Sequence, residues 1–180
     1  FERGDRVEAR IHPTLIPFDH LLASVNGNFN AFHFIGDASG SVFLYGQGAG
    51  MDPTASAVVS DLMDISRDIL NGVSGRIPPR TVPEDQIEDM RILPMEDIVT
   101  NYFFRFTAVD RPGVLSKISG ILGRYDISIA AVIQKGRKLD GVVPVVMTTH
   151  MAKEKAVRKA LREIDRLDVV GGETVVIRIE

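Results

Sequence analysis

The sequence predicts an α+β protein in which a mixed α/β segment precedes a ferredoxin-like unit with the element order βαββαβ. The stretch 75–94 holds four prolines and a cluster of acids without a sustained apolar period, which is typical of a linker. Formal net charge changes sign along the chain, from −8 over residues 1–100 to +5 over 101–180. We therefore expect two domains, over 1–74 and 99–180, with a linker over 75–98.

The composition permits a packed core and excludes several classes of chemistry. Apolar residues make up 44% of the 180 residues and charged residues 25%, close to the globular average. No apolar run approaches the ~18 residues that span a bilayer, and no signal peptide is evident, so we expect a soluble, cytoplasmic protein without a membrane partner. The absence of cysteine excludes disulfides, thiolate nucleophiles and Cys-ligated metals. Basic residues alternate with acids, so we expect no nucleic-acid partner.

The first half predicts short strands and one helix. Extended segments are expected over 6–11, 28–35 and 41–45, and the turn residues Gly36–Gly40 make the last two a hairpin. A helix follows, with Asp52 as N-cap and Pro53 at its first position. Its apolar residues recur with a helical period from Ala55 to Ile69. So few elements do not easily close a core, which indicates the end of a larger domain.

The second half predicts the complete ferredoxin-like unit. Its order is strand, helix, strand, strand, helix and strand, with a polar turn between the second and third strands. The predicted ranges are 102–109, 114–125, 127–134, 142–149, 152–167 and 173–179.

The glycine-rich loop GQGAG over 46–50 lies directly before the predicted helix. Glycines at 46, 48 and 50 permit close approach to the backbone, and a helix N-terminus favours anions. The spacing matches neither a dinucleotide fingerprint nor a P-loop. From the pattern alone, both a tight structural turn and a ligand-binding loop stay open.

The turn Asp110–Gly113 joins a strand to a helix in the second half. Pro112 fixes the turn, Gly113 permits close approach, and the N–H groups of the helix starting at Val114 suit a carboxylate. Asp110 either caps this helix or accepts a hydrogen bond from a ligand ammonium. No His, Asp or Glu set indicates a metal site: the recurring aspartates after residue 60 describe a solvated helix face.

Particular strings resemble known families. HPTLIP over 12–17, SVNGNFNA over 24–31 and YGQGAGMDPTASAVVSD over 45–61 resemble, in order and spacing, the C-terminal part of the catalytic region of homoserine dehydrogenases. The string YFFRFTAVDRPGVLSKISGILGRYDISIAAVIQKG over 102–136 resembles an ACT domain, a small-molecule sensor that bacterial homoserine dehydrogenases often carry. The resemblance implies a remnant of a mixed α/β catalytic domain followed by a regulatory ACT domain.

The family implies an oxidoreductase that interconverts L-homoserine and L-aspartate 4-semialdehyde with NADP or NAD, in threonine and methionine biosynthesis. Contact with the cofactor carries over to Gly48, Ala49 and Gly50, and support of the loop to Pro53 and Thr54. No catalytic residue carries over, because the family uses lysine for proton transfer and residues 1–100 contain none. All six lysines belong to the sensor half, so the catalytic residues are expected upstream of this chain. The chain alone is therefore expected to be inactive and to hold no cofactor.

The ACT resemblance implies an amino-acid effector site shared between two copies, and hence a homodimer or higher homo-oligomer. Threonine is the effector that the family suggests, although residue identities do not establish it. The site is expected to comprise Asp110, Pro112, Gly113 and Val114, with the strand start at Ile127 and Ile129 as the opposite wall. The alternative is a non-enzymatic, amino-acid-binding regulator whose first half only supplies a dimerisation sheet.

Overall fold

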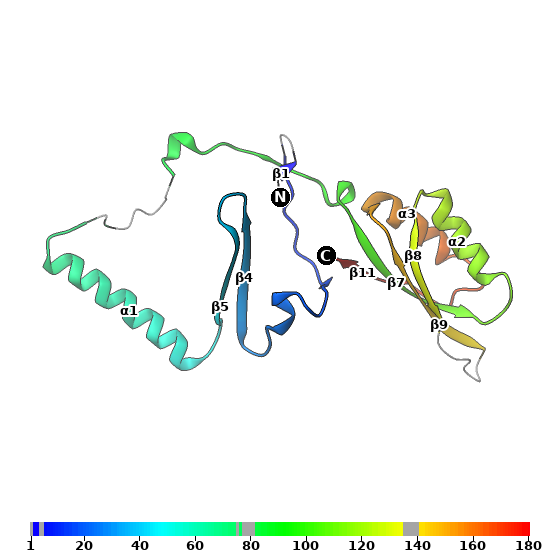
Figure 1. Ribbon diagram of the computed structural model, residues 1–180, viewed down its shortest axis with the longest axis horizontal. Coiled ribbons are helices and arrows are strands. Elements are labelled where there is room, and N and C mark those ends of the chain that lie inside the picture. The colour runs from blue at the N-terminus through cyan, green and yellow to red at the C-terminus, as the bar shows by residue number, and fades with distance from the viewer. Residues whose placement is uncertain (1, 4–5, 75, 77–81, 135–140) are drawn as a thin grey trace. The chain divides into compact units, whose positions relative to one another are not determined.

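The computed structural model describes every residue except 1, 4–5, 75, 77–81 and 135–140 (Figure 1). Parts of the predicted linker and of the polar turn before Gly141 lie outside the described residues. The chain divides into two compact units, one of Phe1–Ile16 with Met90–Glu180 and one of Pro17–Asp89. Because the first unit combines both ends of the chain, the two units do not correspond to two consecutive stretches of sequence. The domain boundaries at 74 and 99 stay a prediction.

The larger unit confirms the predicted βαββαβ order. Its main sheet runs β3-β11-β7-β9-β8, with antiparallel pairing from β11 through to β8. The elements are β7 (Val99–Val109), α2 (Val114–Arg124), β8 (Ile129–Gln134), β9 (Val142–Thr149), α3 (Glu154–Ile164) and β11 (Val175–Ile179). The short strand β10 (Ala152–Lys153) precedes α3 and pairs with β7.

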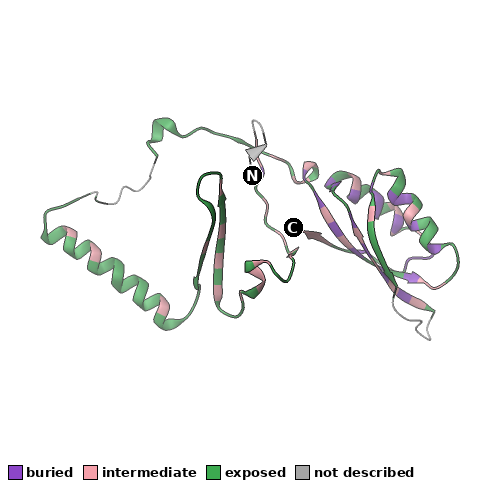
Figure 2. Cartoon of the chain, in the orientation of Figure 1, coloured by how far each residue is buried: buried purple, intermediate pink, exposed green. Residues whose placement is uncertain are grey.

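The core of this unit lies between the sheet and its two helices. Side chains of β7 alternate, so that Tyr102, Phe104 and Phe106 are fully buried. Both helices cover the same face of the sheet, and the buried residues gather there (Figures 1 and 2). The core also contains, from the helices and from β9, Val114, Ile118, Ile121, Leu122, Val143, Val145, Met147, Val157, Ala160, Leu161 and Ile164.

The N-terminal segment of the chain pairs with strands of the same unit. The predicted strand over 6–11 is shorter than expected, β2 (Arg6–Val7), which pairs with β1 (Glu2–Arg3) and with β6 (Arg91–Ile92). Farther along, β3 (Thr14–Leu15) lies parallel to β11 and extends the main sheet. A short 3₁₀ turn, Met95–Asp97, follows β6.

The smaller unit contains the predicted hairpin and helix. Strands β4 (Phe29–Gly36) and β5 (Gly40–Gln47) pair in continuous antiparallel register. Helix α1 (Met51–Leu70) begins earlier than predicted: its N-cap is Gly50 and not Asp52, which lies in the first turn. Proline is tolerated within that turn because the first N–H groups of a helix have no intrahelical partner. The unit also holds 3₁₀ turns at Leu21–Ser24 and Glu84–Gln86.

Among the described residues, every buried apolar side chain lies at Ile98 or later. Helix α1 has no buried residue (Figure 2). Its apolar residues Val58, Leu62 and Ile65 are more than half exposed. As the sequence indicates, residues 17–89 do not close a core of their own. No helix within the described part of the chain has the length and apolar character to cross a membrane.

Candidate functional site

The glycine-rich loop at the end of β5 is hydrogen-bonded to Asn28, the residue before β4. The Gly48 N–H donates to the Asn28 carbonyl oxygen over 2.8 Å, and the Asn28 side-chain amide donates to the Ala49 carbonyl oxygen, also over 2.8 Å. A Cβ on Gly48 would lie only 1.6 Å from Nδ2 of Asn30. Glycine is therefore needed at 48 unless the Asn30 side chain moves. Asn28 therefore holds Gly48 and Ala49 through two hydrogen bonds, and the Asn30 side chain lies beside Gly48.

The start of α1 continues the loop. Gly50 has a φ of 134°, which favours glycine, and its carbonyl oxygen accepts from the Thr54 N–H at 3.1 Å. A Cβ on Gly50 would lie 3.2 Å from Cδ of Pro53, so the proline ring packs against the cap. Pro53 and Thr54 thus both contact the residue that ends the loop.

A mostly apolar hollow of about 760 Å³ opens beside this helix start. Gly50 and Thr54 line it, whereas Gly48, Ala49 and Pro53 do not. The remaining lining residues are Met51, Ala55, Val58 and Val59. The arrangement offers a flat apolar surface next to backbone N–H groups of a helix N-terminus, which suits a planar ligand with an anionic part.

Sequence reasoning missed the role of Asn28 and Asn30. Both belong to the string SVNGNFNA, which carried only a family resemblance, and both lie far from the loop in sequence. The spacing of these asparagines gives no signal of the contact, because Asn28 and Asn30 come near the loop only through the pairing of β4 with β5. The register of the hairpin places Asn30 opposite Gly46, and this explains why the Asn30 side chain lies near Gly48.

The turn before α2 borders a small cavity of about 130 Å³. Asp110, Pro112, Gly113 and Val114 all line it, so the structure brings these predicted residues together. The rest of the lining combines apolar residues with polar ones: Ala108, Val109, Arg111, Leu115, Gln134, Val143 and Val145. Since drug-sized ligands occupy ~300–1,000 Å³, the cavity suits a ligand as small as an amino acid.

Helix α2 has no side-chain cap, so Asp110 does not act as its cap. The N-cap is Gly113, which has a left-handed φ of 88°. An oxygen of Asp110 instead accepts from the Gln134 amide at 3.3 Å, and the Asp110 N–H donates to Gly141. The carboxylate thus lies at the cavity, where it can accept from a ligand ammonium.

Ile127 and Ile129 do not line this cavity within the chain. Ile127 is buried in the core, and Ile129, the first residue of β8, packs against it. The shared effector site stays a prediction.

A second polar cluster, unpredicted from the sequence, lies inside the larger unit around Glu154. The Tyr102 hydroxyl donates to Glu154 at 2.9 Å, Arg178 donates two hydrogen bonds at 2.9 and 2.6 Å, and Arg158 donates one at 2.8 Å. Burial favours the neutral acid, but the hydrogen bonds from both arginines and the tyrosine outweigh it and hold the pKa of Glu154 below its usual value. Burial, and then the hydrogen bond to Glu154, raise the pKa of Tyr102. These groups join α3, β7 and β11.

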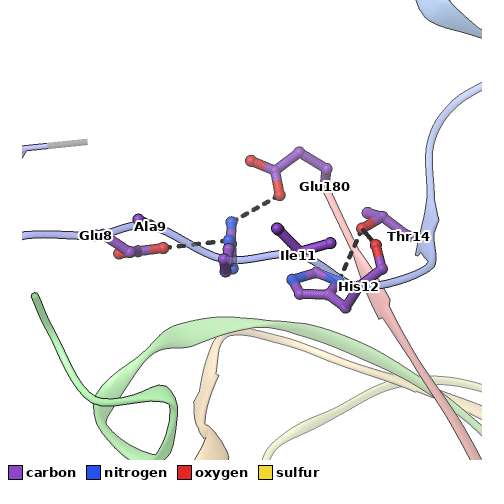
Figure 3. A pocket seen from close by; sticks show the side chains of 7 residues that line it. Glu8, Ala9, Ile11, His12, Thr14 and Glu180 are labelled. Carbon is purple, nitrogen blue, oxygen red and sulfur yellow. Dashed lines mark hydrogen bonds and ion pairs between the residues drawn. The ribbon is translucent and has the colours of Figure 1, made fainter.

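The histidines make local contacts. His20 accepts from the Leu22 N–H at 3.1 Å, His33 lies 2.7 Å from the Ser41 hydroxyl, and His12 lies 3.0 Å from the Thr14 hydroxyl. His12 also lines a cavity of about 460 Å³ that Glu8 and Glu180 border (Figure 3).

The recurring aspartates of α1 do not form a metal site. Asp64 and Asp68 pair with Arg76 at 2.7 and 3.0 Å, as a solvated helix face allows. Over the described part of the chain, no three His, Asp or Glu side chains are grouped to hold a metal ion.

Comparison with known protein families finds a match for each of the two parts of the chain. Residues 3–63 match the family described as homoserine dehydrogenase, and residues 102–169 match the ACT domain family. The homoserine dehydrogenase of Pseudomonas aeruginosa is 42% identical over 174 residues, 96% of this chain and 40% of that protein. That of Mycobacterium tuberculosis is 40% identical over 183 residues, 99% of this chain and 40% of that protein.

A solved structure agrees with these matches. The crystal structure of a homoserine dehydrogenase from Thiobacillus denitrificans is 43% identical and superposes with a TM-score of 0.83, over 99% of this chain and 40% of that one. The chain therefore spans about 40% of the length of the curated relatives it matches.

Proposed function

We propose that this chain, which belongs to the homoserine dehydrogenase family and carries an ACT domain, supplies two parts of one enzyme. The first is a cofactor-contacting segment of the catalytic region, and the second is an amino-acid sensor. The enzyme interconverts L-homoserine and L-aspartate 4-semialdehyde in threonine and methionine biosynthesis. A stand-alone regulator is not favoured, because residues 3–63 match the catalytic family and not a sensor.

The glycine-rich loop is proposed to contact NADP or NAD. Gly48, Ala49 and Gly50 would lie against the cofactor, and Pro53 and Thr54 would hold the loop. The observation that supports this fit is the backbone at Gly50, which has a φ of 134° and lines the apolar surface beside the start of α1. A glycine has no side chain there to keep a ligand away from the backbone. A bound cofactor supplies the hydride acceptor or donor, while these residues position it.

Proton transfer is proposed to rely on a group outside this chain, because residues 1–100 contain no lysine and all six lysines belong to the sensor half. The exposed apolar residues of α1, Val58, Leu62 and Ile65, fit the same view. An apolar helix face is removed from water only when a partner covers it. The remaining ~60% of the family's length is the natural source of such a partner.

The cavity at Asp110–Gly113 is proposed to bind an amino acid, with threonine as the first candidate. The N–H groups at the start of α2 would receive the carboxylate, and Asp110 would accept from the ammonium. The apolar floor of Ala108, Val143 and Val145 would contact the side chain. Strand β8 lies at an edge of the sheet, which supports assembly into a homodimer or higher homo-oligomer.

The test is an assay of L-homoserine-dependent reduction of NADP and NAD. The product of the complete gene should turn over, and the 180-residue chain alone should not, because its residues 1–100 contain no lysine and it spans only about 40% of the family's length. Turnover by the isolated chain would contradict the assignment of roles. Failure of the complete gene product with both cofactors would contradict the proposed activity.

A further inference from the structure

Asn28 bridges the gap between the β4–β5 hairpin and the start of α1. The strand pairing ends at Gln47, and the helix begins at Met51. The Asn28 carbonyl oxygen accepts from the Gly48 N–H at 2.8 Å, which continues the ladder by one residue. Its side-chain amide then donates to the Ala49 carbonyl oxygen at 2.8 Å. One residue therefore holds both positions between the strand and the N-cap of the helix.

The turn before β4 places Asn28 for these two contacts. Gly27 has a φ of 66°, and the Phe29 N–H donates to the Asn26 carbonyl oxygen at 3.3 Å, which closes a four-residue turn. The Asn26 side-chain amide donates to the Ser24 carbonyl oxygen at 2.9 Å, within the same turn region. Of the two asparagines that flank the glycine, only the second therefore reaches the glycine-rich loop.

The hydrogen bond from Asn28 sets the orientation of the peptide that joins Ala49 to Gly50. This peptide is trans, so its C=O and N–H point in opposite directions. Because the Ala49 carbonyl oxygen is directed at the Asn28 amide, the Gly50 N–H points to the other side. Within the part of the chain that the structure describes, this N–H has no hydrogen-bond partner. It is therefore available to donate to a ligand.

Gly50 also lines the apolar hollow of about 760 Å³ beside α1. A Cβ on Gly50 would lie 3.2 Å from Cδ of Pro53 and 3.8 Å from Nδ2 of Asn28. The proline ring and the asparagine amide thus both lie where a side chain of residue 50 would project. A ligand on the apolar surface is in contact with the same residue whose N–H the Asn28 amide directs.

We propose that Asn28 is a positioning residue for the cofactor, whose amide holds the Ala49–Gly50 peptide so that the Gly50 N–H donates to an oxygen atom of NADP or NAD. The inference rests on the proposed contact between the glycine-rich loop and the cofactor, and it adds the group that directs this contact. Asn28 acts through the peptide. The same donor is present before and during hydride transfer, so it contributes to cofactor binding more than to the rate of the bound complex.

The test uses the complete gene product and three variants. Asn28→Ala removes the donor, and Asn28→Asp keeps the shape of the side chain but sets a carboxylate oxygen against the Ala49 carbonyl oxygen. Asn26→Ala is the matched control, because Asn26 is also an exposed asparagine whose amide donates to a backbone carbonyl oxygen. Calorimetry with NADP and NAD gives the dissociation constants.

The dissociation constant of the cofactor should rise by about threefold to tenfold in Asn28→Ala and by about tenfold or more in Asn28→Asp. In Asn26→Ala it should stay within about twofold of the wild-type value. The KM for the cofactor should follow the dissociation constant, while kcat at saturating cofactor stays nearly constant. In hydrogen exchange, the cofactor should protect the peptide over residues 47–52 in wild type and in Asn26→Ala, and less in Asn28→Asp.

A wild-type dissociation constant in Asn28→Asp, or an equal loss in Asn26→Ala, would overturn the positioning role and leave the proposed function intact. A fall in kcat without a change in cofactor affinity would do the same. Both residues are exposed, so the variants should fold; if Asn28→Asp does not, Asn28→Ala decides. If the wild-type product binds neither NADP nor NAD, the proposed cofactor contact fails and the inference fails with it.

Discussion

The hydroxyl of Tyr102 donates a 2.9 Å hydrogen bond to the carboxylate of Glu154, and both side chains are buried. Tyr102 lies in β7 and Glu154 begins α3, so the bond joins the sheet to a covering helix. Arg178 of β11 completes the contact. A buried carboxylate with these donors stabilises the unit only while it is ionised.

Glu154→Gln should therefore destabilise the chain in a pH-dependent way. The variant leaves Arg178 without its anion, for which we expect a loss of about 3–5 kcal/mol at pH 7. Because folding lowers the pKa of Glu154, its contribution is complete above the pKa of the unfolded chain and is lost as pH falls through the lower, folded pKa. Urea unfolding from pH 7 to 3 should show the difference between wild type and variant shrinking below about pH 4.

Glu163→Gln is the control for that series. Glu163 pairs with Arg124 on the surface, so its loss should cost at most about 1 kcal/mol. A penalty for Glu154→Gln that is as small as this, or that stays constant to pH 3, would contradict the stabilising role of the buried carboxylate.

Gly48→Ala should weaken cofactor binding, because the added Cβ would lie 1.6 Å from Nδ2 of Asn30 and must push that side chain away from the loop. In the complete gene product we expect the KM for NAD(P) to rise by about tenfold or more, since small displacements of positioning groups are costly. Gly46→Ala is the control: a Cβ there meets nothing within 4 Å. Steady-state kinetics with NADP and NAD measure the effect.

The double variant Gly48→Ala with Asn30→Ala separates crowding from other causes. If the clash is responsible, removing the Asn30 amide should recover most of the lost affinity, which a double-mutant cycle records as coupling between the sites. An equal loss in Gly46→Ala and Gly48→Ala would show that the loop depends on general flexibility and not on the approach of Asn30.

The sequence predicts those features that depend on neighbouring residues. The alternation along β7 and the helical period after Gly113 are local patterns, so the βαββαβ order follows from them. The pairing of Thr14 with Arg178 joins residues far apart in the chain and leaves no local pattern. The cap of α1 was misplaced because Asp52–Pro53 has the composition of a cap, whereas Gly50 adopts the conformation of one.

The candidate sites, like the fold, were predictable only where their residues are close together in the sequence. The residues of the turn Asp110–Gly113 are consecutive, so their position at one cavity follows from the turn itself. The contact between Asn30 and Gly48 depends on the hairpin register, and the Glu154 cluster depends on three elements meeting in the core. Neither arrangement can be read from spacing.

Helix α1 should be poorly protected in the isolated chain, because it has no buried residue. Amides over 55–69 should exchange much faster than those of β7, whose aromatic side chains are fully buried. In the complete gene product the same amides should become protected, since the exposed apolar face then has its partner. Hydrogen exchange on both proteins measures this. Slow exchange of α1 in the isolated, monomeric chain would show that the helix packs within it.

Gly113→Val should abolish amino-acid binding without unfolding the chain. Gly113 lines the cavity, and a Cβ there meets nothing within 4 Å, so the new side chain would enter the space proposed for the ligand. Its φ of 88° adds backbone strain of about 1–3 kcal/mol. The control Gly120→Ala lies within α2, also with open space around it, and should bind normally with slightly raised stability. Calorimetric titration with threonine and other amino acids, together with thermal unfolding, distinguishes blocked binding from lost structure. Undiminished binding by a folded Gly113→Val variant would place the effector site elsewhere, because no ligand can share the volume that the valine side chain fills.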